Sequence, residues 1–185
     1  MTSGSAVPRP HVVLAAVASI DGYLTRHDEP GAGSFASEAD QVHFRALMRS
    51  VDSSIFGGST YRTDRAHIRP DLRPDLLRVV WTREPAAFAG EAVPGQLEFS
   101  AAEPVELLAD LGARGCRRTA FVGGEGMIGR FLAEDLIDEL QLTVEPYLFG
   151  SGHRLNSTRV DLTFELAGVT QLSERTLLVR YLRPR

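Results

Sequence analysis

Residues 119–129 read TAFVGGEGMIG, an apolar run followed by a glycine cluster and a second apolar run. This order predicts a strand, a tight turn and the start of a helix in immediate succession. Glycine lets the backbone approach a ligand closely, and the free N–H groups and dipole of a helix N-terminus favour an anion. The stretch therefore indicates a pyrophosphate site, with a ligand-free turn as the alternative interpretation. The candidate contacts in it are Val122, Gly123, Gly124, Glu125, Gly126, Met127 and Ile128.

A carboxylate interrupts this glycine turn. Glu125 would repel a pyrophosphate unless its side chain points away or binds a ribose hydroxyl. The spacing of Gly124, Gly126 and Gly129 also matches the dinucleotide fingerprint of a Rossmann fold. That alternative predicts an acidic ribose partner about 20 residues further on, for which Glu145 is the nearest candidate. It ranks lower, because the chain after Gly129 is too short for the remaining units of that fold.

Length and composition indicate one globular domain. The chain has 185 residues, of which 43% are hydrophobic and 24% charged, as in ordinary folded proteins with a sizeable core. A formal net charge of -4 argues against sequence-independent binding to nucleic acid. No apolar run approaches the roughly 20 residues that span a bilayer, and the histidines lack metal-site spacing. The single cysteine, Cys116, excludes an intramolecular disulfide and fits the cytoplasm.

Strand-like and helix-like segments alternate along the chain as far as residue 145 and then give way to two strands joined by a polar turn. This predicts a three-layer α/β fold, with a mixed, mainly parallel sheet of about eight strands and a C-terminal antiparallel hairpin. Residues 1–10 are expected to form a flexible tail, and residues 11–185 a single domain. Strands are expected at 11–18, 53–56, 77–81, 97–99, 118–122, 139–144, 162–170 and 176–182, and helices at 37–49, 104–112 and 126–136, with a short helix opening at 57–60.

Two other strand ends carry groups that suit phosphate. Residues 57–60, Gly-Gly-Ser-Thr, follow a strand and open a helix, so they offer N–H groups and hydroxyls. A hydroxyl and a guanidinium follow the strand that ends at Trp81, and they suit a 2′-phosphate, with an ordinary solvated loop as the alternative. Together with the first turn, these strand ends favour NADPH over NADH as the cofactor. The candidate contacts are Gly57, Gly58, Ser59, Thr60, Thr82 and Arg83.

With these turns in place, the chain resembles the dihydrofolate reductase superfamily, and within it the C-terminal reductase domain of the bifunctional deaminase-reductases of bacterial riboflavin biosynthesis. The resemblance implies a dihydrofolate reductase-like fold and NADPH held on the glycine turns. It places the nicotinamide against the end of the first strand, in contact with the backbone of Ala18, and it favours a homodimer. The matching elements are residues 19–22, Asp40, residues 57–61, Thr82, Arg83, residues 122–124 and residues 138–143.

The same resemblance assigns a substrate carboxylate to Asp40 and its hydroxyl partner to Thr143. A carboxylate in an apolar cleft can bind an N–C–NH₂ edge and support ring protonation, and burial would raise its pKa. The alternative is that Asp40 only completes a capping box with Ser37. The implied activity is NADPH-dependent hydride transfer to a C=N or similar electrophilic carbon of a pterin-like or aminopyrimidine-like heterocycle or a sugar imine. The alternative function is a non-catalytic or regulatory NADPH-binding module, which Glu125 favours.

Overall fold

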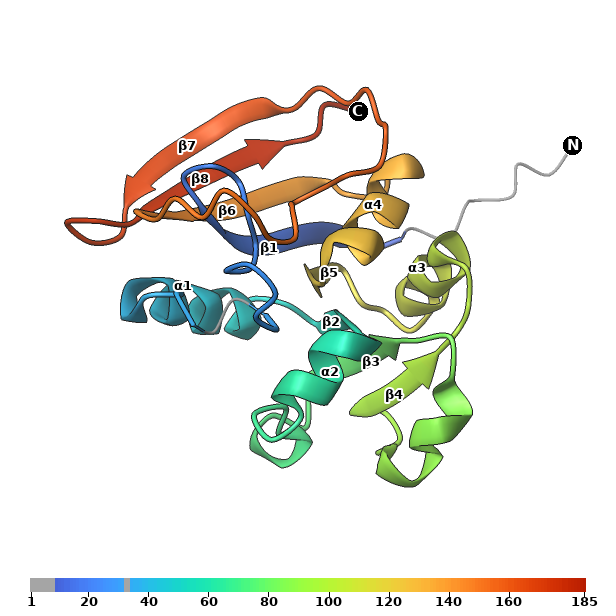
Figure 1. The fold of residues 1–185 in the computed structure, drawn as a ribbon. Helices are drawn as coiled ribbons and strands as arrows, with labels where there is room; N and C mark the ends of the chain where they lie inside the picture. Colours follow the sequence, from blue (N-terminus) through green and yellow to red (C-terminus); the bar gives the residue numbers. More distant parts are fainter. Residues whose placement is uncertain (1–8, 32–33) are drawn as a thin grey trace, which may run out of the picture.

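The structure is a computed structural model that describes residues 9–31 and 34–185 (Figure 1). The described residues form these strands: β1 (His11–Ser19), β2 (Ser53–Gly57), β3 (Leu77–Trp81), β4 (Leu97–Ser100), β5 (Arg118–Val122), β6 (Glu139–Glu145), β7 (Glu165–Gln171) and β8 (Leu177–Leu182). All eight belong to one sheet, in the order β4-β3-β2-β5-β1-β6-β8-β7. The strands from β4 to β6 pair in parallel, and β8 pairs antiparallel with β6 and β7. The predicted mainly parallel sheet and C-terminal hairpin are confirmed.

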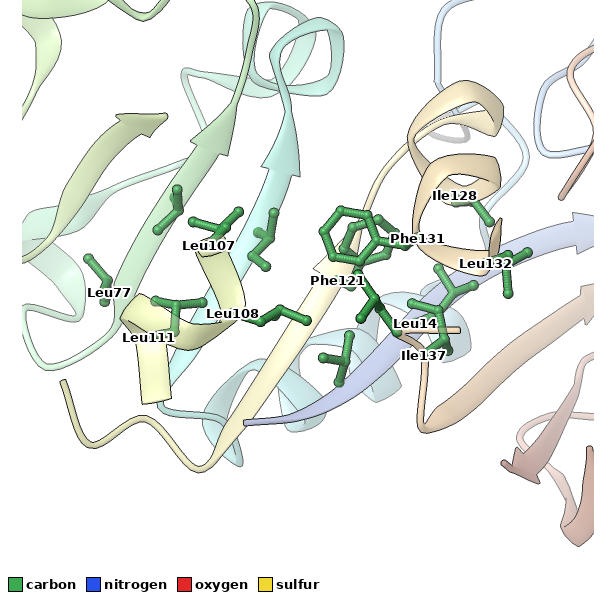
Figure 2. Packing of buried hydrophobic residues seen from close by; sticks show 14 of the residues in the cluster. Leu14, Leu77, Leu107, Leu108, Leu111, Phe121, Ile128, Phe131, Leu132 and Ile137 are labelled. Atoms are coloured by element: carbon green, nitrogen blue, oxygen red, sulfur yellow. The ribbon is translucent and has the colours of Figure 1, made fainter. Parts of the chain in front are cut away.

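Helices cover both faces of this sheet, which makes three layers (Figure 1). They are α1 (Glu38–Arg49), α2 (Gly58–Asp64), α3 (Pro104–Ala113) and α4 (Glu125–Ala133), with short 3₁₀ helices η1 (Pro70–Leu72) and η2 (Pro85–Glu91). Leucines of α3 and Phe131 of α4 pack on one face around Phe121 of β5 (Figure 2). Leu47 of α1 packs against Val13 of β1 on the opposite face, and α2 covers β3 on that side. The main core therefore lies between the sheet and the α3–α4 layer.

Strands β1 and β6 bury different kinds of side chain. Val12, Val13 and Leu14 of β1 are all buried, as expected for a parallel strand covered on both faces. In β6 the alternate residues that turn toward the α1 layer are polar and also buried: Glu139, Gln141, Thr143 and Glu145. Buried polar groups require hydrogen-bond partners, so this face of β6 must be satisfied by α1 and the hairpin.

One predicted helix end is wrong. The apolar pattern predicts a helix over 126–136, but α4 ends at Ala133. Asp135 takes a φ of 53°, its N–H donates to the carbonyl of Leu132, and Leu136 N–H donates to Phe131. This is a Schellman-type termination in which an aspartate takes the position usually held by glycine. The next two apolar residues still enter the core, which explains why the sequence pattern continues past the helix.

The two chain ends meet at one carboxylate. The predicted tail of residues 1–10 lies outside the described residues except for its last two. Arg9 donates to both oxygens of Asp138 at 2.6 and 2.8 Å. Arg185 also donates to Asp138 at 2.8 Å, and it bonds Asp135 at 2.9 Å. Asp138 immediately precedes β6, so both ends are held at the amino-terminal edge of the parallel strands.

Replacing Phe131 by alanine tests the packing of the main core. Phe131 is fully buried, and its ring centroid lies 4.1 Å from that of Phe121 and 5.6 Å from that of Trp81. We expect Phe131→Ala to lower the free energy of unfolding by about 3–5 kcal/mol, measured by urea denaturation. The matched control is Leu166→Ala on β7, where the side chain is 61% exposed and the expected loss is below about 0.5 kcal/mol. Equal losses in both variants would contradict this account of the core.

Candidate active site

Three strand ends that the sequence singles out lie next to one another. Phe56 of β2 pairs with Val122 of β5, so the glycine turns that follow these strands are neighbours. Gly57 pairs with Trp81 at the end of β3, which brings Thr82 beside the first of these turns. The chain leaves β2 toward β3 through α2, but leaves β5 toward β6 through α4 on the other face. Ligands of open α/β sheets bind at such a reversal of strand order.

A cleft of about 1790 Å³ opens at this edge of the sheet. Its wall includes both glycine turns, the end of β3, the cleft side of α1 and the polar face of β6. The backbone contact expected of Ala18 stays a prediction. The side chains of Ala18 and Ile128 lie in the core, with exposures of 1% and 0%, and these two residues do not line the cleft. Residues 15–17 of β1 line it instead. The sequence-predicted residues that the cleft does bring together are Asp40, Gly57, Gly58, Ser59, Thr60, Thr82, Arg83, Val122, Gly123, Gly124, Glu125, Gly126, Met127 and Thr143.

Different positions of the β5–α4 turn favour glycine for different physical reasons. A Cβ on Gly123 would lie 2.6 Å from the sulfur of Met127, so packing within the turn requires glycine there. A Cβ on Gly124 or Gly126 would meet no atom of the described residues within 4 Å. Packing therefore does not require glycine at these two positions. A ligand would require glycine there if it approached the free N–H groups at the start of α4 closely. A pyrophosphate is the kind of ligand expected to bind such N–H groups.

The other end of the cleft carries positive charge. A Cβ on Gly58 would lie 3.0 Å from Thr82 Oγ1 and 3.7 Å from Arg62 Nη1, which places the hydroxyl and the guanidinium side by side. Arg83 also lines this end. Neither Arg62 nor Arg83 forms an ion pair with a carboxylate of residues 9–31 or 34–185. A hydroxyl with two unpaired guanidinium groups is suited to a phosphate monoester.

The carboxylate of Glu125 is engaged by a neighbouring loop. Hydrogen bonds from Ser157, from His153 and from the N–H of Arg154 hold the pKa of Glu125 below its usual value. The last two bonds measure 3.2 and 3.4 Å. The side chain of Glu125 therefore fastens residues 153–157 to the start of α4, and these donors compensate its negative charge. The repulsion expected from the sequence is reduced accordingly.

The Rossmann interpretation is wrong. Gly129 faces the loop at 156–158, where an added Cβ would fall on the hydroxyl of Thr158, so this glycine serves packing inside the protein. Glu145 is only 2% exposed and accepts hydrogen bonds from the N–H of Ser37 and the hydroxyl of Thr176. It is not available to a ribose. The antiparallel β6-β8-β7 arrangement also replaces the further parallel units of that fold.

Asp40 is not the reciprocal partner of a capping box. Ser37 is the N-cap of α1, and its hydroxyl accepts the N–H of Asp40 at 3.3 Å. The return bond of a capping box is absent from the described residues, because the N–H of Ser37 donates to Glu145 at 3.0 Å. The carboxyl group of Asp40 is therefore free to face the cleft, where it lies against Thr143.

Burial raises the pKa of Asp40 above its usual value, and the negative charge of Glu145 acts in the same direction. The Thr143 hydroxyl, hydrogen-bonded to the carboxylate, and His43 oppose this rise. Such an environment favours a proton on Asp40, as a proton donor in an active site requires.

Sequence reasoning missed several cleft residues, among them three polar ones that neighbour the predicted residues. His43 lies three positions after Asp40, and its Nε2 is 2.9 Å from Oε1 of Gln141, two positions before Thr143. The helical and strand periods place these pairs on the same faces, so periodicity applied to Asp40 and Thr143 would have found them. Arg62 lies one helical turn after Gly58 and would have been found in the same way.

Other kinds of site receive no support. Within the part of the chain that the structure describes, no three His, Cys, Asp or Glu side chains are grouped so that they could hold a metal ion. None of its helices has both the length and the apolar character that crossing a membrane requires.

Comparison with known proteins gives consistent matches. The model of the RibD C-terminal domain family matches residues 10–178. The riboflavin biosynthesis protein RibD of Corynebacterium ammoniagenes is 30% identical over 176 residues, which cover 90% of this chain and 51% of that protein. This chain thus spans about half the length of that relative.

Solved structures agree on the fold. A riboflavin biosynthesis protein from Shewanella sp. PV-4 superimposes with a TM-score of 0.73 at 25% identity, covering 95% of this chain and 99% of the other. A diaminohydroxyphosphoribosylaminopyrimidine deaminase/5-amino-6-(5-phosphoribosylamino)uracil reductase from Thermotoga maritima gives a TM-score of 0.76 at 19% identity, covering 95% of this chain and 57% of the other. The dihydrofolate reductase-like fold is therefore confirmed.

The raised pKa of Asp40 predicts a pH-dependent loss of stability. Below the unfolded-state pKa of about 3.9, both states hold the proton and burial of the group carries no penalty. As pH rises toward and through the pKa in the folded state, which burial raises, the ionised carboxylate destabilises the folded chain. We expect Asp40→Asn to raise the Tm at pH 8 and to leave it unchanged near pH 4, measured by scanning calorimetry.

The matched control is Glu38→Gln, an exposed carboxylate in the same first turn of α1. It should lower the Tm slightly, because a negative charge at a helix N-terminus is stabilising. A lower Tm for Asp40→Asn than for the wild type at pH 8 would contradict the burial argument.

Proposed function

The chain belongs to the family of RibD C-terminal domains, and from this membership and the cleft we propose that it is an NADPH-dependent reductase. The family implies reductase activity on a pyrimidine substrate. Our proposal is finer: a hydride is delivered to a C=N or similar electrophilic carbon of a small heterocycle of aminopyrimidine or pterin type, or of a sugar imine. Oxidoreductase activity, the cofactor and the substrate class are all part of the proposal.

One observation carries this proposal. The wall of a single cleft includes two anion-suited turns and also Asp40 of α1, whose pKa is raised by burial. A cofactor with a pyrophosphate and a 2′-phosphate needs the first feature, and reduction of a C=N bond needs a proton source such as the second.

The residues present fit NADPH. The start of α4, with Gly124 and Gly126, would take the pyrophosphate, while Thr82, Arg62 and Arg83 would take the 2′-phosphate. When bound, NADPH supplies the hydride. The inner part of the cleft, along residues 15–17 of β1, is then left for the nicotinamide and the substrate.

Asp40 would supply what the cofactor lacks: a group that orients the substrate and a proton donor. Its carboxyl group would hydrogen-bond an N–C–NH₂ edge of the substrate and thus orient the electrophilic carbon. As the carbon gains the hydride, the electron pair of the C=N bond passes to the nitrogen, which takes the proton from Asp40 directly or through water. Thr143 lines the same cleft, and its hydroxyl favours the ionised form of this carboxyl group.

The alternative function is an NADPH-binding module without catalysis. Its support was the carboxylate of Glu125 in the phosphate turn, and that carboxylate is held by the loop at 153–157. The alternative is therefore weaker than the sequence suggested, and the turnover experiment below separates it from the reductase. A homodimer and a cytoplasmic location stay predictions.

Replacing Gly124 by alanine tests the cofactor site. The new methyl group enters open space, so the Tm should not change, but it blocks anions from the N–H groups of α4. We expect NADPH affinity to fall about tenfold or more, or roughly 1.4 kcal/mol. Quenching of Trp81, the only tryptophan and part of the cleft wall, measures binding.

The control is Gly90→Ala in η2, where an added Cβ also meets no described atom within 4 Å, away from the cleft wall. Its affinity for NADPH should equal that of the wild type. Unchanged affinity in the Gly124 variant would remove this turn from the proposed site.

Replacing Asp40 by asparagine tests the activity itself. Asparagine keeps the shape and can still accept the Thr143 hydroxyl, but it has no proton to donate. We expect unchanged NADPH affinity and a kcat lower by roughly 10²–10⁴, followed as NADPH absorbance with aminopyrimidine, pterin and imine substrates. Unchanged turnover would exclude Asp40 from the reaction. Binding of NADPH without turnover of any substrate by the wild type would instead favour the module.

A further inference from the structure

A second buried carboxylate stands beside the candidate active site without a cation. Glu145, at the end of β6, is 2% exposed and forms no ion pair with an arginine or histidine of the described residues. Glu139 on the same face of the same strand is equally buried, yet it pairs with Arg118, Arg180 and His11. A buried charge is destabilising unless it is compensated. The lack of an ion pair at Glu145, next to the well-paired Glu139, therefore needs an explanation.

Glu145 is one of three contacts between α1 and β6. Residues three apart on a helix and two apart on a strand lie on one face. Ser37 accordingly donates its N–H to Glu145, and His43 lies 2.9 Å from Gln141, with Asp40 and Thr143 in the cleft wall between these pairs. Glu145 is therefore within one step of Asp40 along both elements, a separation on the order of 5–7 Å.

The hydrogen bonds around Glu145 all point toward its carboxylate. Thr176, in the turn before β8, has one hydroxyl proton and donates it to Glu145 at 3.0 Å. The hydroxyl of Ser37, 3.3 Å from that of Thr176, must then be the donor between the two. Ser37 also gives its N–H to Glu145, so every donor in this chain is polarised toward that carboxylate.

Asp40 has less support for a negative charge. The hydroxyl of Thr143 and the side chain of His43 on its own helix favour the ionised form, whereas the charge of Glu145 of β6 opposes it. When two carboxylates share a poorly solvated site, one of them tends to keep its proton, and the better-bonded one ionises. Here the carboxylate that accepts more hydrogen bonds from described residues is Glu145.

We propose that Glu145 is a positioning residue of the reductase, whose fixed negative charge keeps Asp40 in its proton-donating form and whose hydrogen bonds hold the start of α1 against the β7–β8 turn. Glu145 touches neither the substrate nor the cofactor in this proposal. Its effect on chemistry passes through Asp40, so the inference rests on the proposed function. It explains why a buried carboxylate without a cation lies at this place.

The test compares two variants that act on Asp40 in opposite directions. Glu145→Gln keeps the size and can still accept the Ser37 N–H, with its amide N–H donating to the Thr176 hydroxyl, but it removes the charge. The pH at which kcat falls with rising pH should therefore move lower, and turnover at pH 8 should fall several-fold. Thr143→Val removes the hydrogen bond that favours the ionised form of Asp40, so the same limb should move higher. Glu38→Gln removes an exposed charge from α1 and should leave the limb unmoved.

A second readout does not depend on turnover. Carbon-13 NMR of the labelled aspartate carboxyl groups, with the Asp40 signal identified through Asp40→Asn, follows the titration of Asp40 directly. The proposal expects an elevated midpoint in the wild type that moves lower in Glu145→Gln and higher in Thr143→Val. An unmoved midpoint in a folded Glu145→Gln protein would overturn it.

An ordinary midpoint for Asp40 in the wild type would also overturn the proposal, whether or not the glutamine variant folds. A shifted midpoint together with a complete lack of NADPH oxidation would refute the proposed reduction while supporting the coupling of the two carboxylates. A purely structural role for Glu145 predicts a lower Tm for Glu145→Gln with the kcat limb and the Asp40 midpoint unmoved, and that result would exclude the positioning role.

Discussion

The parallel register between β2 and β5 is the constraint on which the cleft depends. Because Phe56 faces Val122 across this pair, two glycine turns that are far apart in the sequence end at the same level of the sheet. The helices that follow them then leave toward opposite faces, and the space between them becomes the cleft. A shift of one residue would turn Phe121 away from the α3–α4 layer, so core packing fixes the register that the site needs.

The second organising feature is the polar face of β6. Alternation along a strand normally places polar residues toward solvent, yet α1 covers this face and buries all four polar side chains. Three of them, Glu139, Gln141 and Glu145, have hydrogen-bond partners that come from three different elements: the start of α1 and α1 itself, the hairpin and the start of β5. The helix α1 that covers this face of the sheet therefore also presents Asp40 to the cleft. The packing of α1 against β6 and the electrostatic environment of Asp40 depend on the same residues.

Much of this arrangement was predictable from local sequence. The turn at Val122–Gly124 and the apolar run in β1 predicted the strand-turn-helix order, and almost every proposed cofactor residue does line one cleft. The features that local sequence did not predict depend on contacts between distant residues or on backbone conformation. The end of α4 depends on a left-handed aspartate that has no glycine signal. The partners of Glu145 lie on two other elements, so no pattern within β6 could reveal them.

Asp138 holds Arg9 at one end of the chain and Arg185 at the other, on the edge of the sheet opposite the cleft. Arg9 and Arg185, the first and last described residues, are therefore neighbours in space on the side of the sheet away from the site. A second module joined at this point would leave the mouth of the cleft open to solvent. This geometry makes the domain suitable for fusion, and it agrees with a relative of about twice its length that carries a matching region within a larger protein.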